Sequence, residues 1–521
     1  MRTPARLIPA AAFALLLTWA QWEQLGPPAD SAQIHVLIEP RMPARVYLFK
    51  GNASFRLGPA DAMLPIKTDL FYRDPLWTKS ADPKVLEVIA SDQLHTLLLK
   101  GEATFYVPPG SYRMEAYRGL FYTPADAEFT LKPNEKRQVV LRLNPWEGVN
   151  PKEWISSDDH IHLTRARLHD SVFLAWLEAE DLTVGNFLQL QRQMDAAVQY
   201  GFGKQAEARR GGYVIRSGQE SRNEFWGHIN LLGPERLVRP LSTGTMYANT
   251  PESYPFPSVI FEQGRKLGAT VGYAHFFQPP QHSSIYMDAA LGNIDFVEVF
   301  QFGVLKTGPW YELLNAGLRV TGIAGSDFPV NLNGRRPWPH WLPLIGPERT
   351  LVKASPGPNS YTDWAEGVRE GRVVVSNGPL VELNLDPATG KGEATAAFWR
   401  PLEILEIVRN GEVIAWTKGD RNRKRLQVSA ETRAPGQSAW IAARVRAESK
   451  TGEPDIQAHT NPVYLLHNNQ PVRVESARRA VAAKWEQEMT YFRNAGITFP
   501  RPAEEAQFRE AAGRALAALQ Q

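Results

Sequence analysis

The pattern of apolar and polar positions divides the chain into β-rich ends and a mixed middle. Between Ile34 and Asn144, short β-rich runs alternate with turns, as in ATFYVPPGSYRMEAYRG, where two strands flank Pro-Pro-Gly. Short runs bounded by Pro, Gly and Asn are typical of strands joined by tight turns. We therefore expect a small β-sandwich over residues 33–145.

From about Ile155 to Val381, buried strands alternate with helical patterns. The strand-like runs are ATVGYAHF, IDFVEVFQF and LRVTGIAGSD, and the helical runs PSVIFEQGRKLG and PWYELLNAGL each end near a glycine. Such alternation predicts a parallel α/β barrel or a layered α/β fold. This domain is expected over residues 150–385.

The β pattern returns beyond about Pro401. LEILEIVRNGEVIAW predicts a hairpin around Asn-Gly, and AWIAARVRAES and NPVYLL predict further strands. From Glu475 to Gln521 the spacing is helical and indicates a pair of terminal helices. We expect a C-terminal β domain over residues 386–470 and terminal helices over 471–521.

Composition narrows the possible classes of protein. A chain of 521 residues predicts roughly two to four domains. Its formal net charge is only +3 and it has no Lys/Arg block, which argues against nucleic acid as a partner. The chain contains no cysteine, which excludes disulfides, thiolate metal sites and cysteine nucleophiles.

The N-terminus predicts export. Arg2 and Arg6 precede an apolar run from Leu7 to about Ala20, and Thr18-Trp19-Ala20 places small residues at the −3 and −1 positions of a cleavage site. This run is shorter than the ~20 residues of a relaxed membrane span. We expect a secretory signal peptide in residues 1–26, with an N-terminal anchor as the alternative. The protein is then periplasmic or secreted, without a membrane span in the mature chain; oligomerisation stays open.

The stretch SSDDHIHLTRARLHD, which begins at Ser156, is the first candidate for chemistry. Alternate side chains of a strand point to one side, so Asp158, His160 and His162 are expected to converge. Imidazole and carboxylate together suit zinc or manganese. The alternative is an ordinary strand with polar residues exposed to solvent.

Further metal-ligand types follow other predicted strands. They are Glu220, His228, His275 and Asp327. Functional side chains gather at the carboxyl ends of parallel strands, so we expect these residues to converge with His160 and His162 on one mouth. Each has an ordinary alternative when taken singly. A histidine after a strand is often a structural hydrogen-bonding residue, and Gly-Ser-Asp is a common helix N-cap.

The same motifs carry a family resemblance. DDHIH, EFWGHINLLG, ESYPFPSVIFEQGRKLGATVGYAHF, ALGNIDFVEV, WYELLNAGLRV, AGSD and GRVVVSNGPL occur in the order and spacing of the CehA/McbA family of metallohydrolases, a branch of the PHP (polymerase and histidinol phosphatase) superfamily. The resemblance covers Trp146 to Leu385, nearly half of the chain. It implies a distorted β/α barrel with a divalent-metal centre at the carboxyl ends of its strands. The N-terminal strand layout also resembles carboxypeptidase-regulatory-like modules.

The resemblance extends to individual ligand positions. Asp158 to His162 stand where the family has Asp-Leu-His-x-His, His275 at its strand-end histidine and Asp327 at its Gly-(Ser/Thr)-Asp; Glu220 and His228 match its acidic and Gly-His positions.

Two departures from the family pattern are present. His275-Phe276 replaces the usual His-Pro, and LTVGNFLQLQ offers only Asn186 and Gln189 where related phosphatases carry an Asp/His pair. We therefore expect one or two divalent ions and not three. Zinc is favoured, with manganese or iron as alternatives.

This ligand set predicts hydrolysis by a metal-activated water. Asp327 or Glu220 is the expected proton acceptor, and His228 or His282 the expected proton donor, although His282 stands in a loop-like sequence. Glu298 either reaches the site or forms a structural ion pair.

The surrounding residues bear on the substrate. Aromatic residues near the ligands are Trp226, Phe276, Phe277, Tyr286, Phe328, Trp338 and Trp341, and the nearby cations are Arg222, Arg335 and Arg336. This balance favours a small ester, amide or carbamate with an apolar or aryl group over a phosphomonoester, although aromatics are also ordinary packing residues.

Three functions therefore stay open: an exported metal-dependent hydrolase of small carbonyl compounds, a PHP-type phosphoesterase, and a non-catalytic extracytoplasmic binding protein. The second requires the arginines near Asp327 to face the site, and the third requires a barrel that binds no metal.

Overall fold

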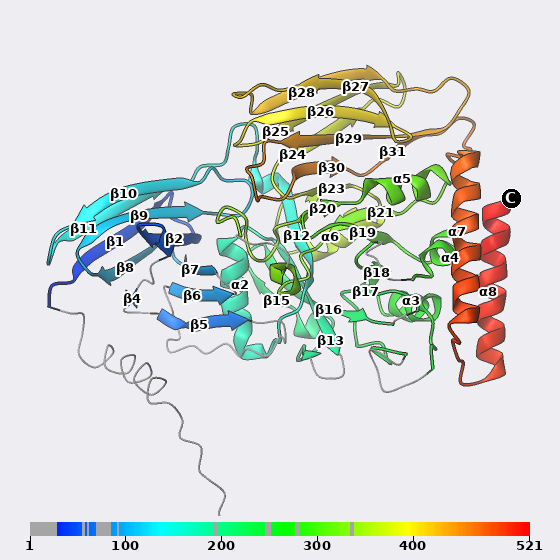
Figure 1. Cartoon of the computed structure of the whole chain (residues 1–521), viewed down its shortest axis with the longest axis horizontal. Helices are drawn as coiled ribbons and strands as arrows, with labels where there is room; N and C mark the ends of the chain where they lie inside the picture. Colours follow the sequence, from blue (N-terminus) through cyan, green and yellow to red (C-terminus); the bar gives the residue numbers. More distant parts are fainter. Residues whose placement is uncertain are drawn as a thin grey trace, which may run out of the picture.

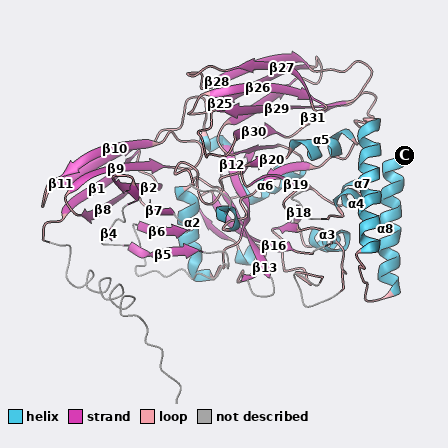
Figure 2. Ribbon diagram, in the orientation of Figure 1, coloured by secondary structure: helices cyan, strands magenta, loops and turns pink. Residues whose placement is uncertain are grey.

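The computed structural model describes residues 29–54, 58–59, 62–68, 85–90, 93–191, 196–223, 225–244, 252–276, 282–333 and 338–521. The predicted signal segment, residues 1–26, lies outside this range. The fold is mixed α/β with several sheets (Figure 1). In Figure 2 the parts of the chain on either side of the mixed middle consist mainly of strands, and the two long helices follow at the C-terminus.

The N-terminal part consists of two sheets around one core. One has the strand order β11-β1-β8-β4 and the other β10-β9-β2-β7-β6-β5, with β3 paired to β2. Alternate residues of β1 are buried, and they pack with residues of β2 and β9 from the second sheet. The strands are β1 Ala32–Glu39, β2 Ala44–Lys50, β3 Ala53–Ser54, β4 Gly58–Pro59, β5 Ala62–Thr68, β6 Val85–Ala90, β7 Gln93–Leu98, β8 Glu102–Val107, β9 Gly110–Tyr117, β10 Ala125–Leu131 and β11 Lys136–Arg142.

The middle part interleaves strands and helices. Its strands are β12 Trp154–Ile161, β13 Val184–Gln191, β14 Ala196–Ala197, β15 Ala208–Arg210, β16 Tyr213–Ser221, β17 Ile229–Leu232, β18 Thr270–Tyr273, β19 Phe296–Gln301, β20 Val304–Leu305, β21 Thr321–Ala324, β22 Arg349–Lys353 and β23 Val373–Ser376. Its helices are α2 Asp170–Ala179, α3 Pro257–Lys266, α4 Ile285–Ala290, α5 Thr307–Asn315 and α6 Ser360–Arg369. Every residue of β12 is buried, as expected for a strand covered on both faces.

The strands of the middle part pair in the succession β12, β13, β16, β17, β18, β19, β21. After β21 the chain returns to β12, where Ile161 and Phe328 form a parallel bridge. The pairing is not parallel throughout, because β17 runs antiparallel to both of its neighbours. The described residues of this connection, 222–223 and 225–228, contain no helix, and β16 and β17 pair as neighbouring antiparallel strands.

The C-terminal part continues the same sheet. Strand β22 pairs with β12 and β23, and β23 pairs with β30. The predicted Asn-Gly hairpin is confirmed between β26 and β27, where Asn410 and Gly411 both have positive φ. The strands are β24 Leu380–Leu385, β25 Lys391–Ala397, β26 Leu402–Arg409, β27 Glu412–Lys418, β28 Arg425–Glu431, β29 Ala439–Ala447, β30 Ile456–Thr460 and β31 Val463–Leu465.

The predicted pair of terminal helices is also present. Helix α7 spans Glu475–Asn494 and helix α8 spans Pro502–Gln520, and they pack against each other and against α4 (Figure 1). Phe492 and Phe508 contact the ring of Trp226, which precedes the predicted ligand His228 by two positions. Within the part of the chain that the structure describes, no helix has the length and apolarity needed to span a membrane.

Candidate metal centre

The residues predicted as ligands all meet at one place. His160 lies in β12 and His162 follows it, Glu220 lies near the end of β16, and His228 precedes β17. His275 follows β18 and Asp327 follows β21. All of these side chains are buried, and they form overlapping groups in which the donor atoms lie within 4.8 Å of one another. Such groups can hold a metal ion.

Asp158 does not converge with the two histidines as strand alternation predicts. Its Oδ1 accepts hydrogen bonds from the backbone N–H groups of His160 and Ser326 at 3.1 and 2.9 Å, and its Oδ2 accepts from that of Gly346 at 2.7 Å. The pairing of β12 with β13 shifts register between Asp158 and Ile161, which breaks the alternation. Asp158 is therefore a structural carboxylate.

One group of donors is arranged around a common point. The Nε2 atoms of His160 and His162 are 3.0 Å apart. Asp327 Oδ1 lies 3.5 and 3.3 Å from these two nitrogens, and Glu220 Oε2 lies 3.7 and 3.1 Å from them. A tetrahedral zinc ion with ligands at about 2.0–2.1 Å separates its donors by roughly 3.3–3.4 Å. Asp327 Oδ1 is also buried without a hydrogen-bond partner. The donor set and its spacing fit a metal ion.

A second group adjoins the first through Glu220. Whereas Oε2 faces His160 and His162, Oε1 lies 3.0 Å from Nδ1 of His228 and 3.2 Å from Nε2 of His275. The Nε2 atom of His275 is in turn 3.7 Å from Asp327 Oδ2. Each of the two carboxylates thus presents one oxygen to each group.

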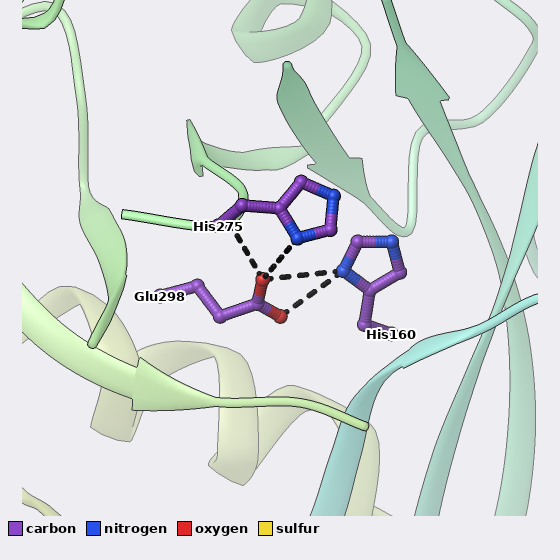
Figure 3. A group of neighbouring side chains, drawn as sticks. All are labelled: His160, His275 and Glu298. Atoms are coloured by element: carbon purple, nitrogen blue, oxygen red, sulfur yellow. Dashed lines mark hydrogen bonds and ion pairs between the residues drawn. The ribbon is translucent and has the colours of Figure 1, made fainter. Parts of the chain in front are cut away.

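Glu298 contacts two of the candidate ligands, His160 through its ring and His275 through its backbone. Its Oε1 lies 3.1 Å from Nδ1 of His160, and its Oε2 accepts a hydrogen bond from the backbone N–H of His275 at 2.9 Å (Figure 3). Oε2 also accepts from the amide of Gln301 at 3.0 Å. Glu298 therefore reaches the site, as one of the two sequence expectations held. Carboxylates behind metal-binding histidines fix their orientation.

Sequence reasoning missed two amides in this network. Gln301 Oε1 lies 2.6 Å from Nδ1 of His275, and Asn230 Nδ2 lies 3.3 Å from Nδ1 of His160. Gln301 stands three positions after Glu298 on the same predicted strand, and Asn230 stands two after His228. The period-two alternation that places His228 and Asn230 on one side of a strand is the signal that could have found Asn230.

Two of the candidate ligands occupy an unusual backbone conformation. His275 has a φ of 49° and Asp327 a φ of 52°, in the left-handed region. For residues other than glycine this conformation costs about 1–3 kcal/mol and is concentrated at functional sites. Gly325, between β21 and Asp327, has no room for a side chain, because a Cβ atom would lie 2.7 Å from Cβ of His160.

The charges of the site are strongly coupled. Burial opposes ionisation of Glu220, but the Arg222 guanidinium and hydrogen bonds from the imidazoles hold its pKa well below the usual value. Burial likewise raises the pKa of Asp327, yet the charges of His160 and His275 outweigh it and lower this pKa. Burial lowers the pKa of His228 to about 4. Both carboxylates are therefore anionic near pH 7, and His228 is neutral, as metal ligands must be.

Burial also lowers the pKa of His160 and of His275, but the anionic groups beside these two histidines raise it by more. Desolvation lowers the pKa of His160, whereas the charges of Glu298 and Asp327 raise it, and the net result lies well above the usual value. For His275, burial is outweighed by the hydrogen bond with Glu220 and the charge of Asp327, so its pKa is raised. The centre therefore attracts positive charge.

Other candidates of the sequence lie elsewhere. Asn186 donates to Asp159 at 3.4 Å, and Gln189 accepts from the backbone of Gln199 at 2.8 Å. His282 lies 3.0 Å from Glu488 on α7, with its ring stacked on Tyr491 of the same helix. His282 is therefore bound to the terminal helices.

The aromatic residues near the ligands are packing residues. Those within the described range are buried: Trp226, Phe276, Tyr286, Phe328, Trp338 and Trp341. Phe277, Arg335 and Arg336 lie outside the described residues. Arg222 is the cation found at the centre, with its Nε 2.9 Å from Glu220 Oε2.

Comparison of the chain with family models, with curated proteins and with solved structures found no match.

Proposed function

We propose that this protein is an exported, metal-dependent hydrolase of the CehA/McbA type within the PHP superfamily. The observation that carries the proposal is that the Nε2 atoms of His160 and His162 lie 3.0 Å apart, with one oxygen of Glu220 and one of Asp327 each 3.1–3.7 Å from these two nitrogens. Two buried imidazole nitrogens and two anionic carboxylate oxygens at these separations form a donor set whose charge and spacing a divalent ion would match.

The proposed fold of the middle part is a distorted β/α barrel. Its support is the succession of paired strands from β12 to β21 and the bridge between Ile161 and Phe328, which brings the last strand back to the first. The ligands then lie at the strand ends on one side, where barrel enzymes place their chemistry.

We propose two ions, with zinc favoured and manganese or iron as alternatives. His160, His162, Asp327 and Glu220 would hold the first ion. His228, His275 and the second oxygen of Glu220 would hold the other, so that Glu220 contributes to both. A pair of ions bridged by a carboxylate is a common arrangement in hydrolases.

Bound divalent ions would activate a water for attack and polarise the substrate oxygen. Asp327 is the preferred proton acceptor, because Glu220 is also paired with the guanidinium of Arg222. The low pKa of His228 makes it a ligand and not the donor of a proton to the leaving group. His282 is held by Glu488 and takes no part in the proposal.

The proposed substrate is a small ester, amide or carbamate. The nearby aromatic side chains are as buried as the candidate ligands themselves, and the preference for an apolar or aryl group stays a prediction. One observation favours a phosphoester as a second candidate. Arg222 is buried beside Glu220, and a fixed cation next to a metal centre is what stabilises a phosphoryl group.

The first test of the proposal is to measure how much metal the protein contains. Purified protein is measured by inductively coupled plasma mass spectrometry, beside His160→Ala as the variant that should lose the metal. Near-stoichiometric metal in the wild type justifies a panel of aryl esters, carbamates, amides and phosphomonoesters. Wild-type protein that stays metal-free after incubation with zinc, manganese and iron contradicts the hydrolase and favours a non-catalytic binding protein.

A further inference from the structure

The segment 338–346 supports the metal centre through Asp158. The backbone N–H of Gly346 donates to Asp158 Oδ2 at 2.7 Å. The other oxygen of Asp158 accepts from the N–H groups of His160 and Ser326, at 3.1 and 2.9 Å. Asp158 thus joins the segment to the backbone of one ligand and to the residue that immediately precedes another.

The N-terminal sheets hold this segment by a buried arginine. Arg45 on β2 is fully buried, and its Nη1 donates to both oxygens of Glu180 at 2.6 and 2.7 Å. Its Nη2 donates to the backbone carbonyls of His340 and Trp341, at 3.0 and 3.1 Å. The ring of His340 also stacks on Tyr47 of the same strand, at 4.6 Å between centroids.

The C-terminal sheet holds the same segment from another side. The indole N–H of Trp341 donates to Glu453 at 2.8 Å. Arg400 donates to both oxygens of Glu453, at 2.6 and 3.0 Å, and lies over the indole ring of Trp341 at 4.7 Å. Two parts of the chain far apart in sequence therefore converge on Trp341.

The burial of Arg45 and Glu180 has to be explained, because removing both charges from water is costly. Such a pair adds little net stability, because desolvation of both charges offsets their attraction, and its established benefit is a fixed geometry. Here the geometry that Arg45 fixes is that of the backbone at His340 and Trp341.

We infer that Arg45, Trp341 and Glu453 are positioning residues for the metal centre. The N-terminal and C-terminal β domains act together to hold segment 338–346, whose Gly346 amide orients Asp158 and, through it, the strand that carries His160. The flanking domains are then parts of the active site and not spacers. This inference rests on the proposed metal centre.

The test separates geometry from stability. In the double variant Arg45→Met/Glu180→Met, both charges of the buried pair are replaced by apolar side chains, which is often neutral or stabilising. We expect an unchanged or higher melting temperature together with a dissociation constant for Zn²⁺ that is about 10–100-fold weaker, the loss typical of outer contacts to a metal site. The constant is measured by competition with a chromogenic chelator. Arg444→Met/Glu406→Met, which removes an ion pair on β26 and β29, is the matched control and should bind zinc as the wild type does.

Trp341→Phe provides an independent test, because it removes the N–H that reaches Glu453, together with part of the ring that Arg400 covers, and should also weaken zinc binding. It decides the matter if the double variant does not fold. Zinc affinity within twofold of the wild type in the folded variants overturns the inference. A wild type that binds no zinc contradicts the metal centre itself, so the two failures are distinguishable.

Discussion

Nδ1 of His160 lies 3.1 Å from Oε1 of Glu298, on the side of the ring opposite to the donors of the metal centre. A carboxylate only accepts hydrogen bonds, so in the neutral ring Nδ1 carries the proton and Nε2 keeps its lone pair. That lone pair faces His162 and Asp327. Glu298 thereby selects the tautomer in which His160 can be a ligand.

The first prediction concerns this carboxylate. Glu298→Gln keeps the shape of the side chain but lets it donate toward Nδ1, which removes the preference for the metal-binding tautomer. We expect zinc affinity to fall by about 10–100-fold with little change in the fold, measured by chelator competition. Glu312→Gln, which alters a carboxylate on α5 paired with Lys484, is the control. Equal affinities in the two variants would show that Glu298 has no such role.

Glu220 is predicted to determine how many ions bind. Because its two oxygens face different histidines, Glu220→Gln weakens both groups at once. We expect about two ions per wild-type chain and fewer than one in the variant, measured by mass spectrometry after gel filtration. Retention of one full ion would mean that Glu220 belongs to a single group.

Metal removal is predicted to destabilise the protein. An ion that binds only the native state stabilises it by about 4 kcal/mol when the concentration of free ion is a thousandfold the dissociation constant. A strong chelator should therefore lower the melting temperature of the wild type, and added zinc should restore it. His160→Ala, which removes a ligand of the first proposed ion, should show a smaller chelator effect; an effect of wild-type size in that variant would place the stabilising metal elsewhere.

Gly325 is predicted to tolerate no side chain. A Cβ atom there would collide with Oε1 of Glu298 and lie 2.7 Å from Cβ of His160. We expect Gly325→Ala to cost about 1–3 kcal/mol in the free energy of unfolding, measured by urea denaturation, and to weaken zinc binding. Gly308→Ala is the matched control, because a Cβ atom at that position meets nothing within 4 Å. The prediction fails if both substitutions behave alike.

His459 is predicted to give a pH dependence of stability far from the metal centre. Burial lowers its pKa to about 4, so between that pH and the ordinary value near 6.5 the unfolded state binds more protons than the folded state. Stability is thus present above about pH 6.5 and is lost as the pH falls toward 4, by up to about 3 kcal/mol. His459→Gln should reduce this slope, measured by urea denaturation at several pH values. A variant with the slope of the wild type would contradict the assignment.

Strand-end positions allowed the candidate ligands to be predicted from sequence, because the carboxyl end of a strand can be recognised from an apolar run and its polar successor. His275 after GYA and Asp327 after GIAGS are examples. Asp158 was misplaced because a register shift has no signature in DDHIH. His275 and Asp327 both adopt positive φ, and although His and Asp are enriched there among non-glycine residues, this weak preference does not single out these two positions in the sequence.

Contacts between segments far apart in the chain also could not be predicted from the sequence. Glu298 and His160 are separated by 138 positions, and Arg45 and Trp341 by 296. Periodicity predicts which face of a strand is buried but not which other strand covers it. For the same reason the substrate preference drawn from the aromatic residues stays a prediction: those that the structure describes are buried, and so are the candidate ligands.

The pairing of β23 with β30 makes the middle and C-terminal sheets one hydrogen-bonded structure. A truncation near residue 386 would therefore expose the bare edge of β23, which is a template for another chain to add a strand. Shortened forms of this protein are consequently prone to self-association, and a recombinant fragment must carry both regions to remain monodisperse.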